Sequence, residues 1–441
     1  MTTITTEKLY DIYLKYPKVA TDTRKLQSGD LFFALKGGNF NGNAFAAKAL
    51  EAGASYAIID EVEYQTDERC LLVDDVLTAL QDLARYHRKR RLQCAIIGIT
   101  GSNGKTTTKE LVTAVLSAAY RTQATAGNFN NHIGVPLTLL SFPLDLEMGV
   151  VEMGANHHDE INFLCSIAHP HFGIITNIGK AHLEGFGSIE GVARAKGELF
   201  EYLEGAQGRA FLNMNDRRIA DMGYYLQKAS TYGSNKFAKT YGKVVSADPT
   251  LTVRWFPRKK QKTDPNIPPI DIKTQLVGAY NLDNVLAAIA IGTHLKVPPQ
   301  KIREAIENYC PTNNRSQTMQ RGSNTFILDA YNANPSSMTA ALQNFAKLKA
   351  TSKVVVLGDM LELGEYSQDE HQKMVDLLQT MDLQVAVLVG NEFGKAQRPS
   401  NFYHFDTSTQ AAKWFEQQKF SDTHFLIKGS RGIKLEKVLG N

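Results

Sequence analysis

The sequence predicts an α/β protein of three domains: a small α/β N-terminal domain, a central domain with a parallel sheet, and a C-terminal Rossmann-like domain. The length of 441 residues suits three domains of about 150 residues each. Short apolar runs that predict strands alternate with amphipathic helices along the chain. A glycine-rich turn stands between one such strand and a helix. We place the domains at residues 1–90, 91–312 and 313–441.

Composition argues against nucleic-acid and membrane partners. The net charge is only +4 and no polybasic arm occurs, so nucleic-acid binding has little support. No run of about 18 apolar residues could span a membrane, and residues 1–15 do not resemble a signal peptide. The scattered cysteines lack metal-ligand spacing and are expected to be reduced thiols: Cys70, Cys94, Cys165 and Cys310. We therefore expect a cytoplasmic protein.

The first domain is predicted from short strands and a closing helix. The strands are expected over Leu31–Leu35, Ala57–Ile59 and Leu71–Val73, with a Lys36-Gly37-Gly38 turn after the first. Asp74 and Asp75 are expected to cap the helix that follows. Its basic end, from Arg88 to Arg91, is interpreted as a solvated terminus that the helix dipole favours.

The central domain is predicted from buried strands over Cys94–Ile99, Gly149–Met153, Phe172–Ile178 and Ala210–Asn213. Helices are expected over Lys105–Tyr120 and Leu282–Leu295. Strands that alternate with helices favour a parallel sheet. The basic, proline-containing segment from Phe256 to Pro269 predicts an exposed loop or hairpin tip.

The C-terminal domain is predicted to be doubly wound. Strands are expected over Thr325–Ala330, Lys353–Leu357, Val385–Val389 and His424–Ile427, and helices over Ser336–Leu348, Gln368–Thr380, Thr407–Gln418 and Ile433–Leu439. This alternation is typical of Rossmann-like folds. No Gly-x-Gly-x-x-Gly follows the first strand, so a dinucleotide cofactor is not implied.

The sharpest local signal is the turn Gly101-Ser102-Asn103-Gly104-Lys105-Thr106-Thr107, between a buried strand and a helix. Glycines let backbone N–H groups face phosphate oxygens, and the helix N-terminus adds partial positive charge. Lys105 would reach the terminal phosphates, and Thr106 would ligate Mg²⁺. The strict motif has a further glycine where Ile99 stands. The shorter Gly-x-x-Gly-Lys-Thr form still predicts a P-loop mononucleotide-binding domain in preference to a chance glycine turn.

Glu152 and His182 are candidate metal ligands. Glu152 ends one apolar strand and His182 follows another strand of the same predicted sheet, at the edge where carboxyl ends of parallel strands meet. Together they could hold a second Mg²⁺ between the γ-phosphate of ATP and an incoming carboxylate. The alternatives are a solvated acid and an ordinary core or surface histidine. The run from His157 to Glu160 also resembles a metal site, but a polar helix start is the favoured interpretation.

Three further polar residues have ordinary interpretations beside functional ones. By composition alone, Lys196 is a surface lysine on a helix. Asn281 could be the N-cap of the helix that follows it. The amides of Asn281 and Asn284 also suit the edge of an adenine, because each offers a donor and an acceptor.

These motifs, in this order, resemble the Mur ligase family of peptidoglycan synthesis over nearly the whole chain. The resemblance lies in Gly101–Lys105, Glu152–Asn156, Asn177–Glu184, Ala195–Glu198, Tyr280–Asn284 and Asp329–Pro335. Three stretches favour the member that adds D-alanyl-D-alanine: Gly127–Pro136, Asp329–Met338 and Leu357–Gly364. The Asp-Asn-Pro-Arg segment of the diaminopimelate-adding member is not found.

The resemblance implies an activity and its partners. It implies an ATP-dependent amide ligase that joins D-alanyl-D-alanine to UDP-N-acetylmuramoyl-tripeptide through an acyl phosphate, as a cytoplasmic monomer. The N-terminal domain would bind the UDP substrate, the central domain would be the ATPase, and the C-terminal domain would bind the incoming amine. The cofactors would be ATP, as substrate, and two Mg²⁺.

The resemblance also implies roles for individual residues. Lys105, Glu152, His182 and Lys196 would be catalytic. ATP would contact the P-loop together with Asn281, Asn284, Arg315 and Asp329. Mg²⁺ would be held by Thr106, Glu152, His182 and, through a carbamate on its amine, Lys196. The UDP substrate would lie against Thr23, Arg24, Asn130 and Asn131, and Thr23 stands where serine is common in the family. The amine side would include Asn332, Asn334 and Lys428.

Other functions remain open from the residues alone. Another Mur-type or a folylpolyglutamate-type amide ligase would share the P-loop and the metal-side residues. A P-loop kinase or a non-ligase NTPase would use the loop without forming an amide. A non-catalytic nucleotide-binding module is less compatible with the complete set Lys105, Thr106, Glu152 and His182.

Overall fold

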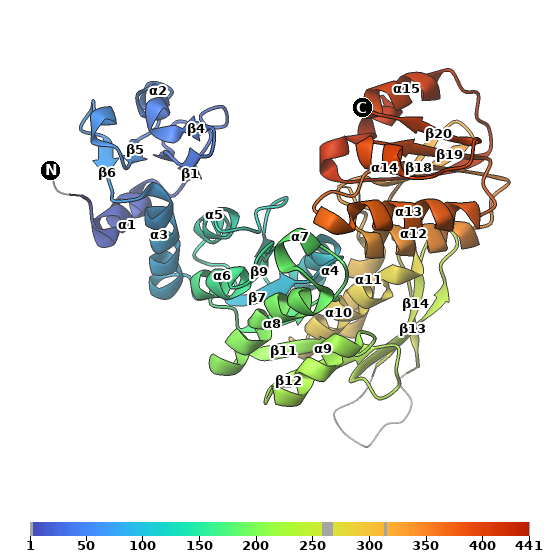
Figure 1. The fold of residues 1–441 in the computed structure, drawn as a ribbon. Coiled ribbons are helices and arrows are strands. Elements are labelled where there is room, and N and C mark those ends of the chain that lie inside the picture. The colour runs from blue at the N-terminus through green and yellow to red at the C-terminus, as the bar shows by residue number, and fades with distance from the viewer. Residues whose placement is uncertain (1–2, 258–267, 313–314, 441) are drawn as a thin grey trace.

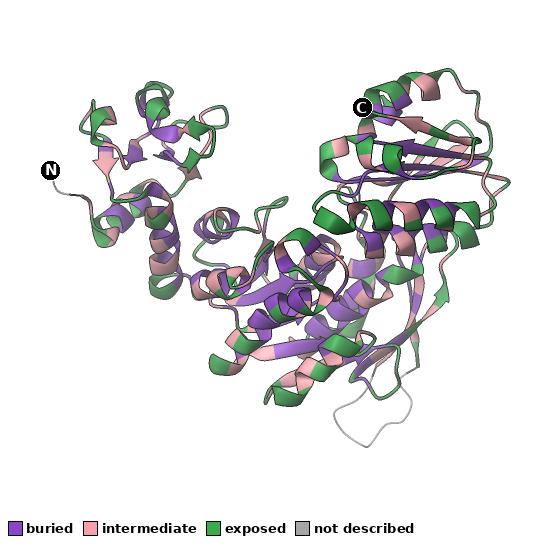
Figure 2. Ribbon diagram, in the orientation of Figure 1, coloured by how far each residue is buried: buried purple, intermediate pink, exposed green. Residues whose placement is uncertain are grey.

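Three sheets of four or more strands follow one another along the described chain, and helices cover each of them (Figure 1). The computed structural model describes residues 3–257, 268–312 and 315–440. Most strands of the two larger sheets are buried, because they are packed between helices (Figure 2). Within the described ranges, no helix combines the length and the apolar character that crossing a membrane requires. All four cysteines are free, and only Cys310 is exposed.

The N-terminal sheet is parallel, with the strand order β1-β2-β5-β6. Its strands are β1 (Val19–Ala20), β2 (Leu31–Phe33), β5 (Tyr56–Ile59) and β6 (Cys70–Leu72). Beside it lie helices α1 (Thr6–Lys15) and α2 (Ala46–Glu51), the ribbon β3 (Lys36–Gly37) and β4 (Phe40–Asn41), and 3₁₀ turns at Gly42–Phe45 and Val62–Tyr64. The predicted strands are thus present with slightly shifted ends.

Helix α3 (Val76–Arg90) closes this part of the chain. Asp75 caps it by accepting a hydrogen bond from the Thr78 N–H at 2.7 Å, as predicted, whereas Asp74 does not take part in the cap. The basic end differs from the prediction. Lys89, Arg90 and Arg91 are exposed, but Arg88 is only 8% exposed.

Arg88 is buried because its guanidinium serves carbonyl groups of the central domain. It donates to Ala168 O at 2.9 Å and to His169 O at 3.2 Å, and it also contacts Leu92 O. Ala168 and His169 end helix α6 (Glu160–Ala168), where helical carbonyls lack partners. A cation is favoured at that end of a helix. The solvated-terminus interpretation is therefore wrong for Arg88.

The central sheet has nine strands in the order β15-β14-β13-β12-β11-β10-β7-β9-β8. Pairings from β8 to β13 are parallel. These strands are β7 (Ala95–Thr100), β8 (Thr122–Ala124), β9 (Met148–Glu152), β10 (Phe172–Ile175), β11 (Arg209–Asn213), β12 (Ala229–Gly233) and β13 (Thr240–Ser246). The P-loop strand β7 lies between β9 and β10, so the C-terminal ends of both neighbouring strands lie next to the P-loop.

Helices pack on both faces of the central sheet. They are α4 (Lys105–Ser117), α5 (Gly134–Ser141), α6, α7 (Leu183–Phe186), α8 (Ile189–Gly205), α9 (Arg217–Met222), α10 (Leu282–His294) and α11 (Pro299–Asn308), with 3₁₀ turns at Gly223–Tyr225 and Ala279–Asn281. The apolar periods that predicted the helices from Lys105 and Leu282 bury one side of α4 and nearly all of α10.

Strands β14 (Thr252–Phe256) and β15 (Ile270–Lys273) pair in antiparallel fashion at the sheet edge, and β14 pairs in the same way with β13. The sequence analysis did not predict these strands. Most of the hairpin tip that it did predict, residues 258–267, lies outside the described residues. The strands that flank those residues form an antiparallel pair.

The C-terminal sheet has the order β16-β17-β21-β18-β19-β20 and is parallel except for the β16–β17 edge. Its strands are β16 (Gln317–Arg321), β17 (Asn324–Asp329), β18 (Ser352–Gly358), β19 (Val385–Val389), β20 (Phe402–Phe405) and β21 (Thr423–Lys428). Its helices are α12 (Pro335–Lys347), α13 (Ser367–Gln379), α14 (Asn391–Lys395) and α15 (Ser408–Glu416). The predicted doubly wound pattern is present.

One predicted helix of this domain is wrong. Residues 433–439 form parts of two 3₁₀ turns, Arg431–Ile433 and Leu435–Leu439. Lys434 separates them with a φ of 56°, and a left-handed residue interrupts a right-handed helix. A third 3₁₀ turn, Gly364–Tyr366, precedes α13.

Candidate active site

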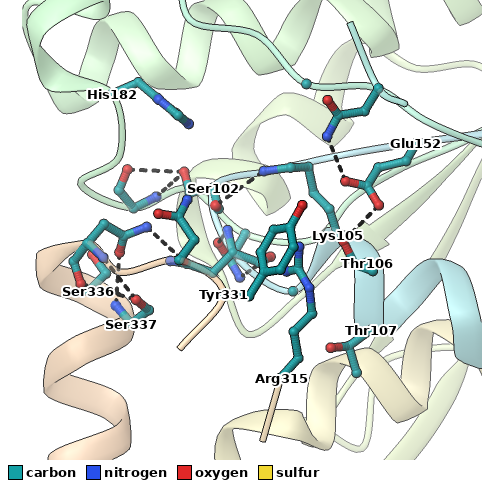
Figure 3. Close-up of a pocket in the computed structure, with 18 of the residues that line it drawn as sticks. Ser102, Lys105, Thr106, Thr107, Glu152, His182, Arg315, Tyr331, Ser336 and Ser337 are labelled. Atoms are coloured by element: carbon teal, nitrogen blue, oxygen red, sulfur yellow. Dashed lines mark hydrogen bonds between the residues drawn. The ribbon is translucent and has the colours of Figure 1, made fainter. Parts of the chain in front are cut away.

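A cavity of about 690 Å³ lies where the central and C-terminal domains meet (Figure 3). From the central domain it is lined by the P-loop, the ends of β9 and β10, and the start of α10. From the C-terminal domain it is lined by residues around Arg315, Asp329 and Ser336, together with Glu362 and Lys428. The cavity is therefore built from segments far apart in the sequence.

Two P-loop positions require glycine. Gly101 has a φ of +141°, and a Cβ there would lie 2.0 Å from Thr176 Oγ1. Gly104 has a φ of +76°, and its Cβ would lie 2.6 Å from Asn284 Oδ1. Both φ values are ones that side-chain-bearing residues rarely adopt. The shorter glycine motif therefore provides a tight turn without a glycine at Ile99.

Residues that follow β10 form hydrogen bonds with the backbone of the P-loop. Asn177 accepts N–H hydrogen bonds from Ser102, through its carbonyl at 3.0 Å, and from Asn103, through Oδ1 at 2.9 Å. The Thr176 hydroxyl donates to Asn103 O at 2.6 Å. These bonds fix the backbone conformation of the loop before a ligand binds.

Lys105 and Arg315 place two cations on the cavity. Lys105 Nζ donates to Gly101 O at 2.7 Å, and burial lowers the pKa of its ammonium, with Arg315 acting in the same direction and Glu152 against it. The Arg315 guanidinium lies 3.8 Å from the centre of the Tyr331 ring, and its buried Nε has no hydrogen-bond partner among the described residues. Two cations that are poorly compensated by the protein suit a polyanionic ligand.

Glu152 is a buried acid with neutral partners. It is 1% exposed; its Oε2 accepts from the Thr106 hydroxyl at 2.9 Å and its Oε1 from Asn130 Nδ2 at 2.8 Å. A buried carboxylate whose hydrogen-bond donors are all neutral favours a bound cation. Its oxygen-rich surroundings fit Mg²⁺. No group of three or more His, Cys, Asp or Glu residues forms a metal site within the described parts of the chain, and Mg²⁺ commonly uses one or two side chains with phosphate oxygens and water.

His182 enters the cavity from the other side (Figure 3). It precedes α7 with a left-handed φ of 51°. Its Nδ1 contacts the carboxylate of Glu362 from the C-terminal domain, and this contact lowers the pKa of the Glu362 carboxyl. Glu362 lies in a segment that carries the family resemblance, but the sequence pattern indicated no role for it.

Lys196 is not a surface lysine. It is 1% exposed on α8, and its Nζ donates to Ala155 O at 3.1 Å and lies 5.1 Å from the centre of the Phe186 ring. Burial and, second, the charge of Lys105 lower its pKa to about 7. Composition could not show this burial, because the helix alone does not reveal which face packs against the Ala155 loop. Lys196 does not itself line the cavity.

Asn281 and Asn284 both line the cavity, but their amides bond within the protein. Asn281 does not cap α10; its Nδ2 donates to Val277 O at 2.8 Å. Its Oδ1 accepts from Asn284 Nδ2 at 2.8 Å, and Asn284 Oδ1 accepts from the Thr108 hydroxyl at 3.0 Å. Asn281 stands at the N-cap position of α10, but its side chain makes no capping hydrogen bond, because it lies in a 3₁₀ turn with helical dihedrals.

The predicted C-terminal residues converge on the cavity. Lys428 is buried, and its Nζ donates to Asp329 Oδ2 at 2.6 Å and to Asn332 O at 3.2 Å. Asn334 Nδ2 donates to Asn103 Oδ1 at 2.7 Å, so this residue of the expected amine side touches the P-loop. Tyr331, Asn177 and Ser336 also line the cavity without having been predicted. The side-chain chemistry of Tyr331 and Ser336 gave little indication of a functional role in the sequence. Both residues line the cavity because the two domains dock against each other.

The residues expected to bind the UDP substrate are not brought together. Thr23 and Arg24 lie in the N-terminal domain and do not line the cavity, and the exposed Arg24 side chain pairs with Asp22 at 2.8 Å. Asn130 and Asn131 do line the cavity. Asn131 Oδ1 accepts from Gly134 N–H at 2.9 Å at the start of α5.

Comparisons with known proteins agree with this architecture. Three family models match the chain: "Mur ligase family, catalytic domain" over residues 15–88, "Mur ligase middle domain" over 99–292, and "Mur ligase, glutamate ligase domain" over 314–431. The chain is 35% identical to the UDP-N-acetylmuramoyl-tripeptide–D-alanyl-D-alanine ligase of Escherichia coli, with 96% of this chain and 92% of the relative covered. The ligase of the same name from Bacillus subtilis is 34% identical, with the same coverage.

Solved structures give the same result. A crystal structure of MurF from Acinetobacter baumannii superposes with a TM-score of 0.83 at 31% identity, covering 96% of this chain and 92% of that one. The Thermotoga maritima MurF ligase, crystallised with ADP, shares the fold with a TM-score of 0.83 at 24% identity, covering 97% of each chain. The three sheets, the P-loop between β7 and α4, and full-length identity above 30% lead to one conclusion: the chain belongs to the Mur ligase family.

Proposed function

We propose that the chain is an ATP-dependent amide ligase that joins D-alanyl-D-alanine to UDP-N-acetylmuramoyl-tripeptide, the reaction named by its full-length relatives. One observation carries the proposal. The P-loop, the buried acid Glu152 and the C-terminal residues Arg315, Asp329 and Lys428 face a single cavity. That arrangement suits a nucleotide bound across two domains, next to a site for a second reactant.

The chemistry begins with charge neutralisation. The peptide carboxylate and the γ-phosphate of ATP repel each other, and Lys105, Arg315 and the P-loop N–H groups offset that charge. A carboxylate oxygen then bonds to the γ-phosphorus and ADP leaves, which gives an acyl phosphate. The amine nitrogen of D-alanyl-D-alanine attacks the acyl carbon, loses a proton and forms the amide, while phosphate leaves. Positioning supplies much of the rate, because no Ser or Cys nucleophile is needed.

Mg²⁺ fits the residues that line the cavity. Thr106 would hold one ion, and Glu152 and His182 together a second. Bound there, Mg²⁺ would neutralise phosphate charge. Asn130 would keep the Glu152 carboxylate in place through its 2.8 Å hydrogen bond.

Lys196 would serve the second metal as a carbamate. Burial favours the neutral amine, which is the form that reacts with CO₂. The reaction forms an N–C bond, releases a proton and replaces a cation by an oxygen anion. The 3.1 Å contact with Ala155 O keeps the amine beside the segment that follows Glu152.

The two substrates and ATP would contact different parts of the chain. The UDP substrate would lie between the N-terminal domain, at Thr23 and Arg24, and the central residues Asn130 and Asn131. The amine substrate would lie near Asn332, Asn334 and Lys428, and ATP would reach Asn281 and Asn284. Closure of the domains would exclude water from the acyl phosphate. A monomer in the cytoplasm would suffice, where ATP and the UDP-linked precursor are available.

A ligation assay tests the proposal. The purified chain is given Mg²⁺, ATP and UDP-N-acetylmuramoyl-tripeptide, with either D-alanyl-D-alanine, single D- or L-amino acids, or glutamate as the amine. Amide product is measured by mass spectrometry and phosphate by release assay. We expect amide only with D-alanyl-D-alanine, and loss of both products in Lys105→Met. Phosphate without amide would indicate an NTPase, and amide with another amine would indicate a different ligase.

A further inference from the structure

The residue pair Glu362 and His182 crosses the boundary between two domains. His182 lies in the loop that follows β10 of the central sheet, and Glu362 follows β18 of the C-terminal sheet. The Glu362 carboxylate contacts Nδ1 of the His182 ring, and both residues line the cavity. The side chains are 54% and 21% exposed, respectively, so this pair adds little to stability and its effect must be sought in orientation.

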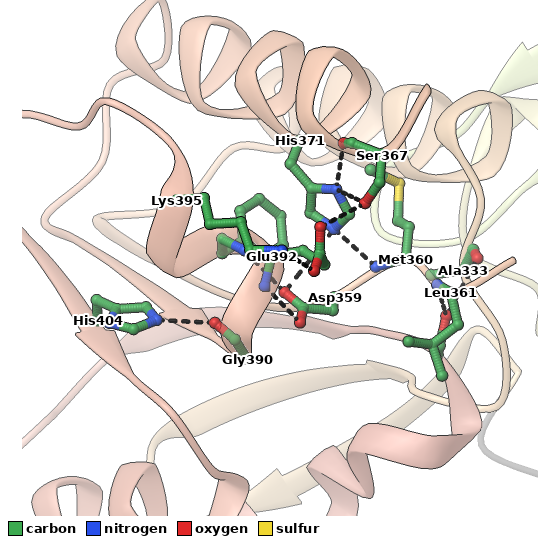
Figure 4. Close-up of polar contacts among 12 residues, drawn as sticks. Ala333, Asp359, Met360, Leu361, Ser367, His371, Gly390, Glu392, Lys395 and His404 are labelled. Atoms are coloured by element: carbon green, nitrogen blue, oxygen red, sulfur yellow. Dashed lines mark hydrogen bonds and ion pairs between the residues drawn. The ribbon is translucent and has the colours of Figure 1, made fainter. Parts of the chain in front are cut away.

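The backbone just before Glu362, from Asp359 to Leu361, is fixed by the C-terminal domain (Figure 4). Asp359 N–H donates to Val389 O at 3.0 Å, and Asp359 O accepts from Ser430 N–H at 3.1 Å. Leu361 N–H donates to Ser430 Oγ at 3.0 Å. Glu362 then adopts a left-handed φ of 64°, which turns the chain at this point. The position of Glu362 therefore comes from the folded domain and does not depend on its contact with His182.

The fully buried His371 also holds the segment before Glu362 in place. His371 Nε2 accepts from Met360 N–H at 3.0 Å, and its Nδ1–H donates to Ser367 O at 2.7 Å (Figure 4). One neutral tautomer satisfies both bonds. The Asp359 carboxylate accepts from Glu392 N–H and Phe393 N–H, each at 2.9 Å. The segment from Asp359 to Glu362 is thus held on both sides.

The contact has a chemical consequence for His182. A carboxylate at one ring nitrogen keeps the proton on that nitrogen and leaves the other nitrogen as an acceptor. We propose that Glu362 is a positioning residue that holds His182 in the tautomer with the proton on Nδ1, so that Nε2 keeps its lone pair, which is the form in which an imidazole could bind the proposed Mg²⁺. Because Glu362 belongs to the C-terminal domain, His182 acquires this state only when that domain is docked. The inference rests on the proposed function and adds the residue that orients His182.

The test is a spectroscopic one with kinetics beside it. Full-length protein labelled with ¹⁵N-histidine is examined by two-bond ¹H–¹⁵N spectra, and the His182 signals are assigned by their loss in His182→Gln. We expect the Nδ1–H pattern in the native chain and a shift toward Nε2–H in Glu362→Ala. We also expect kcat to fall about 10- to 100-fold, as for other residues that orient a metal-binding histidine, with KM for D-alanyl-D-alanine little changed.

Two further variants keep the test specific. Glu362→Gln retains an acceptor oxygen for Nδ1–H and should keep most of the native tautomer and rate. Glu365→Ala removes an exposed acid three positions along the same segment and should match the native chain in both measurements. Thermal unfolding midpoints are measured for every variant, and Glu362→Met, which has a similar volume but no acceptor oxygen, replaces Glu362→Ala as the diagnostic variant if the latter misfolds.

The outcomes separate this proposal from the proposed function. Native His182 nitrogen shifts and native kcat in Glu362→Ala would overturn the positioning role. If the native chain makes no amide but the His182 tautomer still depends on Glu362, the positioning role stands and the ligase function fails.

Discussion

The side-chain amide of Asn334 donates a hydrogen bond to Oδ1 of Asn103, 2.7 Å away, and so joins the start of α12 to the P-loop. Neighbouring contacts act at the same interface. Ser336 Oγ accepts from Lys180 N–H at 3.0 Å, and Lys180 Nζ pairs with the buried Glu370 at 2.7 Å. The shape of the nucleotide site therefore depends on where the C-terminal domain sits.

Asn334→Ser should separate this link from the helix cap. Asn334 Oδ1 accepts from Ser337 N–H at 3.0 Å, and serine caps helices about as well as asparagine. Serine is too short to reach Asn103. Loss of one neutral hydrogen bond, about 1 kcal/mol, should lower kcat/KM for ATP about 5-fold, with an unchanged thermal unfolding midpoint. Asn334→Ala should lose both bonds and about 1 kcal/mol of stability as well. Native kinetics in Asn334→Ser would show that the link has no role.

Glu152→Gln should change metal dependence without loss of stability. The substitution keeps the shape but removes a buried charge whose hydrogen-bond donors, Thr106 and Asn130, are neutral. Amide formation should fall at least about 100-fold and need more Mg²⁺, because a charged ligand oxygen is lost. The unfolding midpoint should stay or rise. The measurement is a Mg²⁺ titration of the rate, with the exposed Glu147→Gln as the control. An unaltered titration would remove Glu152 from the metal site.

Lys196 should take up CO₂ at its amine. Protein equilibrated with ¹³C-bicarbonate is expected to show a carbamate signal in the ¹³C spectrum, because the buried amine has a lowered pKa and is available in its neutral form. The signal should vanish in Lys196→Arg and persist in Lys228→Ala, which alters an exposed lysine. A signal that survives in Lys196→Arg would place the modification elsewhere.

Acidic pH should lower the free energy of unfolding, in part because of His87. Burial, and then the charge of Arg88, lower the pKa of this imidazole to about 4, and Tyr10 Oη lies 3.2 Å from its Nδ1. In the unfolded chain the pKa is near its usual value of about 6.5. Since the unfolded state then binds more protons, stability is complete above about pH 6.5 and falls toward pH 4, by up to about 3 kcal/mol.

Urea unfolding at pH 7 and pH 5 measures this effect. In His87→Gln the loss of stability between the two pH values should be smaller than in the native chain. His157→Gln, which alters an exposed histidine, should retain the native loss. Equal pH dependence in His87→Gln and the native chain would exclude His87 as a source.

The sequence predicted those features that depend on local pattern. The strand Ala95–Thr100 and the glycine turn after it are recognisable because burial, glycine conformation and the lysine follow within a few residues. The state of Lys196, Asn281 and Glu362 depends on partners at Ala155, Val277 and His182, which are distant or outside the recognised motifs. Strands β13 to β15 were missed because their alternating, partly exposed pattern is weak at a sheet edge.

The buried guanidinium of Arg88 bears on whether the chain can be divided into separate fragments near residue 90. One apolar cluster runs from Leu9 and Leu83 through Leu139 and Leu164, and Arg88 serves the last carbonyls of α6 from the other side of the boundary at residue 90. A fragment that starts at residue 91 would expose part of this cluster and leave those carbonyls without their cation. The first 90 residues thus share part of their apolar core and a buried cation with the central domain.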